Sequence, residues 1–239
     1  MRICDDAKHK VAITTNTKLN LHSTRLPDLG IEGATARWYN NNTRKSRLTE
    51  MEEYAKKYLH DGYSVLEVAP GPGYLAIELA KLGICNKIAG LDISKAFVEI
   101  AKRNAKEAVV IEVVEFRHGN VADMHFPDNS FDFIICTAAF KNFKERLRAL
   151  NQMCRVLKSG GNALIVDMNR DASNQQIEDY IKSIEAKDIG KLFMRLIFKY
   201  FLRNGAYTKD DFTSLISKTA FKQHDIREKG MGFYIHLTK

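Results

Sequence analysis

Two glycines and two carboxylates near the middle of the sequence have the spacing of a nucleotide-type cofactor site. Gly71 and Gly73 follow an apolar run, so the backbone there can approach a ligand closely. A helix that begins near Tyr74 would offer free amides to an electron-rich group. Glu67 lies four residues before Gly71, and Asp92 follows 19 residues after Gly73. The second spacing is typical of an acid that binds ribose hydroxyls in a Rossmann-like site.

The elements that position these residues follow from the rhythm of the apolar runs. Short β-rich apolar runs alternate with longer segments whose apolar residues recur at helical spacing. We expect strands at 64–69, 87–92, 112–117, 131–137 and 162–167, and helices at 74–82, 95–107 and 143–157. Strands that are apolar on both faces and separated by helices indicate a parallel sheet covered on both sides. The expected fold is therefore a doubly wound, mostly parallel, Rossmann-like α/β sheet.

The rhythm changes towards the C-terminus. The segment 173–221 is helical in pattern, and only then do two short strands, at 224–228 and 233–238, flank a glycine-containing turn. These two strands predict an antiparallel hairpin and bring the sheet to seven strands. We divide the chain into a flexible N-terminal arm at 1–47, a cofactor-binding core at 48–172, a helical cap insertion at 173–221 and a terminal hairpin at 222–239.

Composition narrows the class of protein. The chain has 239 residues, 45% of them hydrophobic, which suits one α/β domain and excludes global disorder. Its four cysteines are far apart and unaccompanied by paired histidines, so we predict neither a disulfide framework nor a metal site. No stretch approaches the ~18 to 20 uncharged apolar residues of a membrane-spanning helix. We expect a cytoplasmic protein, whose net charge of +8 favours anionic partners.

Several further motifs follow the glycine loop in a fixed order. They are RHGNVADM at 117–124, FDFIIC at 131–136 and RVLKSGG at 155–161. With Glu67 through Gly73 and Asp92, they make the stretch from about Arg47 to Lys239 resemble the class I S-adenosylmethionine-dependent methyltransferases. The resemblance is to the small-molecule branch that includes the ubiquinone and menaquinone biosynthesis methyltransferases. It implies S-adenosyl-L-methionine as the cofactor.

The resemblance also implies which residues hold that cofactor. The glycine loop binds its amino-acid portion, the acid after the second strand binds both ribose hydroxyls, and the segment 117–124 binds adenine. The implied residues are Glu67, Ala69, Gly71, Gly73, Asp92, Ile93, Asn120 and Val121. Two of them depart from the family pattern, because Ala69 replaces a common glycine and Asn120 replaces a common aspartate. We expect Gly73→Val to block the cofactor pocket and leave the core largely intact.

The acceptor side of the site is less well defined by the sequence. Methyl transfer from a sulfonium is an in-line displacement, for which holding the acceptor at the right distance and angle is the main requirement. The resemblance places the loop after the fourth strand beside the methyl group, so Phe140 and Asn142 are candidate acceptor contacts. Trp38 and Tyr39, in the arm, are candidates either for walling the pocket or for packing as a buried staple on the sheet edge. No residue is predicted to be a catalytic base, and a small-molecule acceptor is expected.

A basic stripe distinguishes the segment 191–203. Its cations recur every four residues along one side of an otherwise apolar helical pattern, at Lys191, Arg195, Lys199 and Arg203. One interpretation is a cap helix with a solvated basic edge. The other is a functional surface that meets an anionic acceptor or rests on an anionic membrane.

Two other functions remain open at this stage. The run GPGYLA at 71–76 also satisfies the GxGxxA pattern of an NAD(P)-dependent oxidoreductase, although Glu67 and the adenine motif after the third strand disfavour it. A non-catalytic cofactor-binding or RNA-binding protein would account for the positive charge. Nucleic acid is disfavoured, because no Asn-Pro-Pro-Tyr motif follows the fourth strand and no basic strand face carries aromatic residues. The oligomeric state is not predicted.

Overall fold

A computed structural model describes residues 32–33, 36–37, 57–183, 195 and 205–239. Trp38 and Tyr39 lie outside the described residues, as do most of the expected arm and all of the segment 191–203 except Arg195. The predictions made for those residues therefore stay predictions, and so does the division of the chain into four regions.

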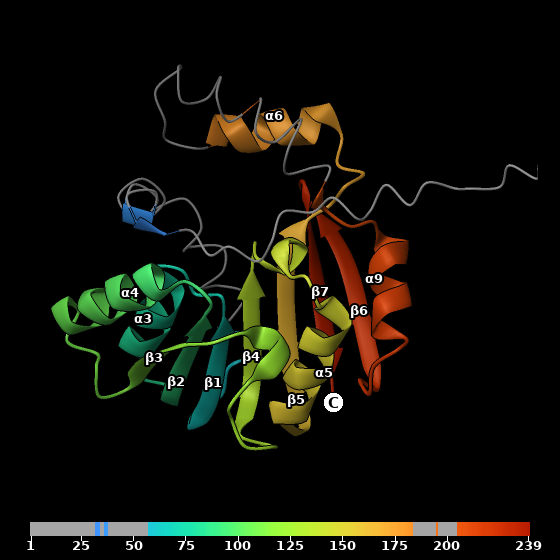
Figure 1. Cartoon of the computed structure of the whole chain (residues 1–239). Helices are drawn as coiled ribbons and strands as arrows, with labels where there is room; N and C mark the ends of the chain where they lie inside the picture. Colours follow the sequence, from blue (N-terminus) through green and yellow to red (C-terminus); the bar gives the residue numbers. More distant parts are fainter. Residues whose placement is uncertain (1–31, 34–35, 38–56, 184–194, 196–204) are drawn as a thin grey trace, which may run out of the picture.

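The described chain alternates strands and helices up to the fifth strand (Figure 1). The elements in this part are β1 (Tyr63–Val68), α3 (Tyr74–Lys81), β2 (Cys85–Asp92), α4 (Lys95–Glu107), β3 (Val114–His118), η1 (Val121–Asp123), β4 (Phe131–Thr137), η2 (Phe140–Asn142), α5 (Arg146–Val156) and β5 (Leu157–Met168). The remaining elements are α6 (Asn174–Ser183), α9 (Lys209–Ile216), β6 (Gln223–Lys229) and β7 (Gly232–Thr238). The predicted strands and the predicted C-terminal hairpin are confirmed.

The seven strands form one sheet in the order β3-β2-β1-β4-β5-β7-β6. The first five strands are parallel, and β7 pairs antiparallel with both β5 and β6. The predicted doubly wound, mostly parallel sheet is therefore confirmed. The chain order reverses between β1 and β4, and at such a switch point an α/β sheet opens a crevice at the carboxyl ends of its strands.

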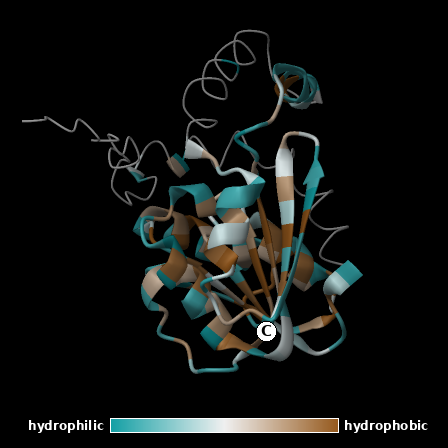
Figure 2. Cartoon of the chain, turned by 90° about the vertical axis from the view of Figure 1, so that its right-hand side faces the viewer, coloured by the Kyte–Doolittle hydropathy of each residue, from teal (hydrophilic) through white to brown (hydrophobic). Residues whose placement is uncertain are grey.

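Helices cover both faces of the sheet and enclose two apolar clusters. Helices α3 and α4 pack on one face, with Leu79, Val98 and Ala101 among their buried residues. Helices α5 and α9 pack on the other, where Leu150 and Phe212 are fully buried. Figure 2 shows the same division, with hydrophobic colours gathered on the strands and polar colours on the outer helix surfaces.

Helix α6 stands apart from these two layers. Figure 1 shows it above the sheet, beyond the edge at which β4 ends. A small apolar cluster that includes Met168 at the end of β5 and Ile177 and Ile181 in α6 holds it there. The other described helix of the predicted cap, α9, instead packs on the sheet, because Phe212 and Ile216 belong to the main core cluster.

The junction between α5 and β5 differs from the expectation. The helix begins three residues later than predicted, at Arg146, and it runs directly into β5 at Leu157. Leu157 pairs with Phe131 and Asn162 with Phe133, so residues 158–161 form a bulge within the strand. Gly161 permits the bulge, since a Cβ there would lie 2.9 Å from the carbonyl oxygens of Asp132 and Lys158.

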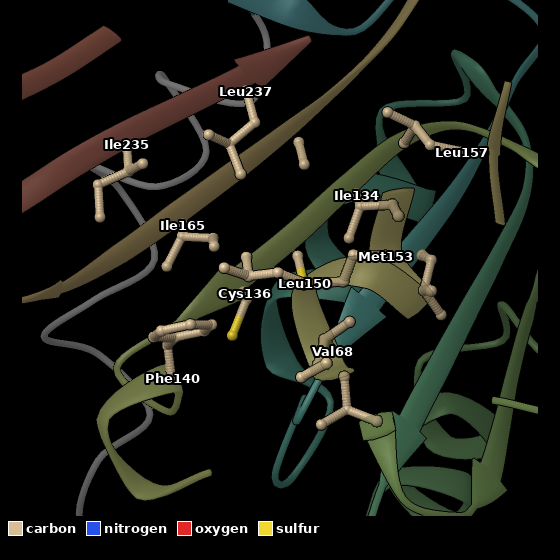
Figure 3. Close-up of a cluster of buried hydrophobic side chains, with 14 of the residues drawn as sticks. Val68, Ile134, Cys136, Phe140, Leu150, Met153, Leu157, Ile165, Ile235 and Leu237 are labelled. Atoms are coloured by element: carbon tan, nitrogen blue, oxygen red, sulfur yellow. The ribbon is translucent and has the colours of Figure 1, made fainter. Parts of the chain in front are cut away.

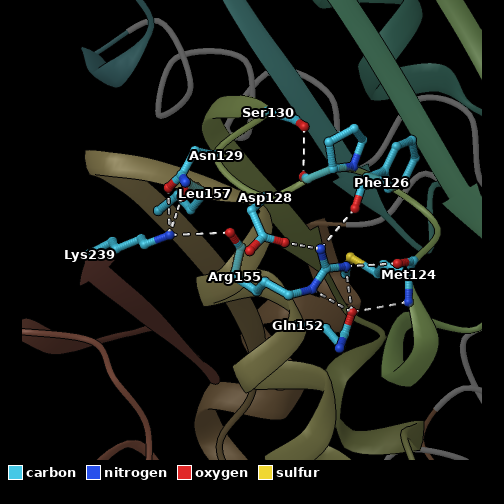
Figure 4. Close-up of polar contacts among 10 residues, drawn as sticks. Met124, Phe126, Asp128, Asn129, Ser130, Gln152, Arg155, Leu157 and Lys239 are labelled. Atoms are coloured by element: carbon cyan, nitrogen blue, oxygen red, sulfur yellow. Dashed lines mark hydrogen bonds and ion pairs between the residues drawn. The ribbon is translucent and has the colours of Figure 1, made fainter.

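Arg155, at the end of α5, anchors the segment that joins η1 to β4 (Figure 4). Its guanidinium donates to the carbonyl oxygens of Phe126 (2.9 Å) and Met124 (2.8 Å) and to the Asp128 carboxylate (2.6 Å). The Gln152 side chain, one turn earlier, accepts from the same guanidinium at 2.8 Å. These bonds fix the position of the loop that carries the predicted adenine-binding motif.

Candidate cofactor and acceptor site

The glycine loop begins with a sharp turn at the end of β1. Ala69 has φ 55°, a left-handed conformation that an alanine rarely adopts, which explains why glycine is common here in the family that the sequence resembles. Gly71 follows with φ 55°, and a Cβ built on it would meet nothing within 4 Å. Gly71 therefore lines open space, as expected of a residue that a ligand approaches closely.

Gly73 is closely surrounded by core side chains. Its φ is 78°, and a Cβ there would lie 2.4 Å from the ring of Phe116 and 2.9 Å from Ala101. Both neighbours belong to the apolar cluster between α4 and the sheet. The expectation that Gly73→Val would clash in the pocket and spare the core is therefore wrong, because the nearest atoms belong to the core.

Glu67 is buried at the end of β1 and ties the strand to the next helix. Its carboxylate is 3% exposed and accepts a hydrogen bond from the backbone N–H of Ala76 at 3.0 Å. Burial raises the pKa of Glu67 to about 8, with a smaller upward contribution from nearby Asp92, against the lowering effect of the Ala76 bond. Such a carboxyl needs a polar or cationic neighbour to be ionised at neutral pH.

Asp92 ends β2 and holds the glycine loop from the side. One of its oxygens, Oδ2, accepts from the N–H of Gly71 at 2.9 Å, and Oδ1 accepts from the N–H of Ser94 at 2.8 Å. Burial raises its pKa, and these two bonds oppose the rise. A carboxylate oxygen can accept two hydrogen bonds, so each oxygen of Asp92 has capacity for a ligand hydroxyl.

Neither carboxylate forms an ion pair among the residues that the structure describes. Glu67 and Asp92 thus place two uncompensated acids against a loop with open space at Gly71. This donor set fits a ligand with a cationic amino-acid end and a ribose diol, because the cation would neutralise Glu67 and the diol would bond to Asp92.

The remaining predicted cofactor residues follow β2 and β3 at the carboxyl edge of the sheet. Ile93, directly after Asp92, is one of the few large apolar side chains that the described surface exposes, and it offers a contact for a flat ring. Val121 is buried in η1. Asn120 precedes it, and its Oδ1 accepts from the N–H of Ala122 at 2.9 Å. The adenine contact predicted for this amide oxygen would use its second lone pair and stays a prediction.

Parts of the arm that the structure describes lie beside this region. The Glu32 carboxylate accepts from the N–H of Ala96 at 3.1 Å, in the first turn of α4. Ala36 is fully buried against Phe97 and Ile100 of the same helix. Glu32 and Ala36 thus lie beside the helix that starts next to Asp92, and the roles of Trp38 and Tyr39 stay predictions.

Of the two predicted acceptor contacts, Asn142 is exposed and Phe140 is not. Phe140 is fully buried, with its ring centroid 5.3 Å from that of Phe212 and 5.4 Å from that of Phe143. Figure 3 shows its ring beside Cys136 in the main core cluster. In this structure Phe140 anchors the loop after β4, and its contact with an acceptor remains a prediction.

Sequence reasoning missed an ion pair in the same loop. Lys141 Nζ lies 3.0 Å from Asp167 Oδ1, and the exposed fractions of the two side chains are 8% and 1%. A signal was present, since Asp167 lies at the end of the predicted fifth strand as Asp92 lies at the end of the second. The lysine could not be matched to it, because 26 residues separate the two in sequence.

Two other features are a contact of Arg195 with α6 and a hollow between α5 and α9. Arg195, the only member of the basic stripe that the structure describes, bonds through Nε to both carboxylate oxygens of Glu178 in α6 at 2.9 Å. A hollow of about 700 Å³ lies between α5 and α9. There Arg170 pairs with Asp211 at 3.2 Å and Arg146 stacks over the Tyr207 ring.

The comparisons with known proteins decide the family. A model described as a methyltransferase domain matches residues 59–225, which is most of the chain. The chain belongs to this methyltransferase family. The ubiquinone/menaquinone biosynthesis C-methyltransferase UbiE of Francisella tularensis is 31% identical over 125 residues, 52% of this chain and 50% of that protein. The demethylmenaquinone methyltransferase of Listeria welshimeri is 34% identical over 110 residues, 46% of each chain. The chain thus spans about half the length of the curated relatives that it matches.

Solved structures confirm the fold of this methyltransferase. A putative S-adenosylmethionine-dependent methyltransferase from Methanococcus maripaludis has a TM-score of 0.71 at 22% identity, covering 88% of this chain and 94% of its own. A SAM-dependent methyltransferase from Aquifex aeolicus has a TM-score of 0.66 at 18% identity, covering 87% and 98%. The predicted family, its Rossmann-like fold and S-adenosylmethionine as the family's methyl donor are therefore confirmed. The comparisons give no support to an oxidoreductase or an RNA-binding protein.

In the part of the chain that the structure describes, no helix is both long enough and apolar enough to cross a membrane. No three metal-ligating side chains gather among those residues either.

Proposed function

We propose that this chain transfers the methyl group of S-adenosylmethionine to a ring carbon of a quinol-type aromatic acceptor. The observation that carries the cofactor half is a pair of buried carboxyl groups, Glu67 and Asp92, which accept from the amides of Ala76 and Gly71 and form no ion pair among the described residues. The acceptor half is supported by the names of the curated relatives, which are C-methyltransferases of quinone biosynthesis and a demethylmenaquinone methyltransferase.

When bound, S-adenosylmethionine supplies an electrophilic methyl group on a sulfonium. The residues of this chain bind and orient it. With the cofactor bound, Glu67 would face its cationic amino-acid end, Asp92 would accept from the ribose hydroxyls, and the exposed Ile93 would contact the adenine ring. The loop after β4 lies at the same carboxyl edge of the sheet, so it would be the neighbour of the methyl group in the bound cofactor.

A hydroquinone ring carbon is a suitable nucleophile because the neighbouring hydroxyl donates electron density to it. In the transfer a C–C bond forms as the S–C bond breaks, and the ring regains aromaticity by releasing the proton of that carbon to solvent. The protein's main contribution is to hold the ring carbon in line with the breaking bond and to exclude water. The proposal assigns no residue to the proton.

The test is an anaerobic incubation with S-adenosylmethionine and a chemically reduced short-chain demethylmenaquinone analogue. Mass spectrometry should find one added methyl group on the ring and an equal amount of S-adenosylhomocysteine. The oxidised analogue serves as the matched control, since its ring carbon is not nucleophilic. Turnover with other small molecules of a cell extract, and none with reduced quinones, would overturn the acceptor half and leave the methyltransferase half standing.

A further inference from the structure

The crevice at the switch point is bordered by two turns of the same kind. β1 and β4 are neighbours, with Val68 opposite Cys136 in their register. Each strand ends in a left-handed alanine, Ala69 and Ala138, both with φ 55°. The Ala69 amide donates to Leu91 in β2 (2.8 Å) and the Ala138 amide to Val166 in β5 (2.7 Å). Each turn is thus attached to the strand on its outer side, and the two turns diverge around the crevice.

Each turn is also fixed by an aspartate at the end of its outer strand. Asp92 of β2 accepts from the N–H of Gly71 at 2.9 Å, and Asp167 of β5 accepts from the N–H of Lys141 at 2.8 Å. The second oxygen of each aspartate accepts an N–H of its own strand end, from Ser94 and Met168 respectively, at 2.8 Å in both cases. The loop after β4 is therefore held in the same way as the cofactor loop.

The two arrangements differ in charge. The carboxylate of Asp92 faces the cofactor crevice without an ion pair among the described residues, whereas Asp167 is neutralised by the ammonium of Lys141. That ammonium also donates to the carbonyl oxygen of Ala138 at 2.6 Å, the residue in the left-handed turn. Lys141 thus connects the Ala138 carbonyl oxygen to the Asp167 carboxylate. The charges of Lys141 and Asp167 cancel, so the pair presents no net charge to a ligand.

We infer that Lys141 and Asp167 are positioning residues for the methyl acceptor. Their ion pair holds the loop 138–142 in one conformation and leaves no net charge at the pair. The loop in turn holds an uncharged acceptor against the transferring methyl group. The inference rests on the proposed function, in that the loop after β4 is taken to meet the acceptor. Neither residue is assigned a contact with a reacting atom.

The variants separate positioning from folding. Lys141→Met removes the ammonium and keeps the length of the side chain, while Lys141→Arg keeps a cation within reach of Asp167. The double variant Lys141→Met with Asp167→Asn removes both charges and keeps a side-chain oxygen that can accept from the N–H groups of Lys141 and Met168, so it leaves no unpaired buried ion and should fold well. Lys158→Met is the matched control, because Lys158 pairs with Asp132 at 2.8 Å at the opposite end of the same two strands.

With the reduced quinone analogue, Lys141→Met and the double variant should lose about tenfold or more in kcat, because small misplacements of a reacting group are strongly felt. The affinity for S-adenosylhomocysteine should change by less than about threefold, since the cofactor loop is untouched. Lys141→Arg should recover most of the activity, and Lys158→Met should keep all of it. Wild-type kcat in the double variant, or an equal loss of cofactor affinity, would overturn the inference.

Hydrogen exchange distinguishes this outcome from a failure of the proposed function. If the wild-type protein does not methylate the quinone analogue, the proposed quinol acceptor is wrong. Hydrogen exchange alone then tests whether Lys141 and Asp167 hold the loop 138–142 in place. Lys141→Met should then speed exchange of the amides of residues 138–142 by about tenfold or more, Lys141→Arg should restore protection, and Lys158→Met should leave these amides unchanged. Unaltered exchange in Lys141→Met would show that the pair does not hold the loop in place.

Discussion

Gly71 and Gly73 share a left-handed backbone and differ in what surrounds them. A Cβ at Gly71 meets open space, whereas a Cβ at Gly73 meets the Phe116 ring at 2.4 Å. Alanine should therefore affect mainly ligand binding at position 71 and mainly stability at position 73. Gly71→Ala should weaken S-adenosylhomocysteine binding about tenfold or more and lower stability only by the backbone penalty, about 1 kcal/mol. Gly73→Ala should lower the free energy of unfolding by about 2 to 4 kcal/mol, through that penalty and overpacking.

Calorimetric titration and urea unfolding of the two variants measure both quantities. Equal losses of stability, or a cofactor affinity in Gly71→Ala that matches the wild-type value, would show that the loop is only a turn.

The raised pKa of Glu67, about 8, predicts a pH-dependent affinity. At about pH 7 the free protein holds a proton on this carboxyl, and the cationic amino group of a bound ligand favours the ionised form. Binding therefore releases a proton. Affinity for S-adenosylhomocysteine should rise with pH, by up to about tenfold per unit, and level off near pH 8. Calorimetry in buffers of different ionisation enthalpy detects the released proton.

Glu67→Gln is the control for this prediction, because Gln can still accept from the Ala76 amide and does not titrate. The same shift acts on stability with the sign opposite to that of an ordinary carboxylate. Between pH 4.5 and about 8 the folded state holds a proton that the unfolded state has lost, so stability falls as pH rises through this window. A wild-type slope that persists unchanged in Glu67→Gln would contradict the assignment.

At the scale of elements, one arginine anchors the segment that follows η1. Arg155 bonds to the Met124 and Phe126 carbonyls, so Arg155→Met should lower the free energy of unfolding by about 2 to 4 kcal/mol. Arg148→Met, in the same helix, should change it by less than about 0.5 kcal/mol, because the Arg148 side chain is 55% exposed and its ion pairs are on the surface. Urea unfolding measures the free energy of unfolding of both variants. Similar decreases would show that the bonds of Arg155 stabilise the fold no more than the surface ion pairs of Arg148.

The elements that could be predicted from sequence are those with a local signal. Strand β1 begins directly after Gly62 and β2 ends at Asp92, and the side chain of Ser94, the N-cap of α4, accepts from the N–H of Phe97 at 3.0 Å. The boundary between α5 and β5 gave no such signal, because the apolar pattern continues through Val156 and Leu157 without a break. The bulge at 158–161 depends on pairing with β4, which sequence spacing does not reveal.

The residues of the candidate site also differ in whether a local sequence signal predicts them. Glu67, Gly71 and Asp92 lie within one motif and could be found from their spacing. Phe140 was chosen by its place after the fourth strand, and whether it faces a pocket or the core depends on α9, which comes about 70 residues later. Lys141 and Asp167 come together only because β4 and β5 end side by side.

At the scale of the whole molecule, vesicle binding separates the two interpretations of the basic stripe, a solvated cap edge and a functional surface that rests on an anionic membrane. The triple variant Lys191→Gln, Lys199→Gln and Arg203→Gln should lose most binding to anionic vesicles, and S-adenosylhomocysteine affinity should stay unchanged. Arg195→Gln should have a smaller effect, because this guanidinium already binds Glu178. Vesicle sedimentation should show weaker binding at 0.15 M salt than at 0.01 M, as the Debye length falls from about 30 Å to about 8 Å. If the wild-type protein does not bind anionic vesicles at low salt, the stripe is a solvated edge of the cap.

The central claim is that the crevice at the ends of β1 and β2 binds S-adenosylmethionine through Glu67 and Asp92. Its most direct test is a calorimetric titration of the wild-type protein and Asp92→Ala with S-adenosylhomocysteine and, separately, with NAD. We predict that S-adenosylhomocysteine binds, that NAD gives no heat, and that Asp92→Ala weakens binding by about 1 to 3 kcal/mol through lost bonds to the ribose. Heat from NAD alone, or an unchanged affinity in a folded Asp92→Ala variant, would contradict the claim.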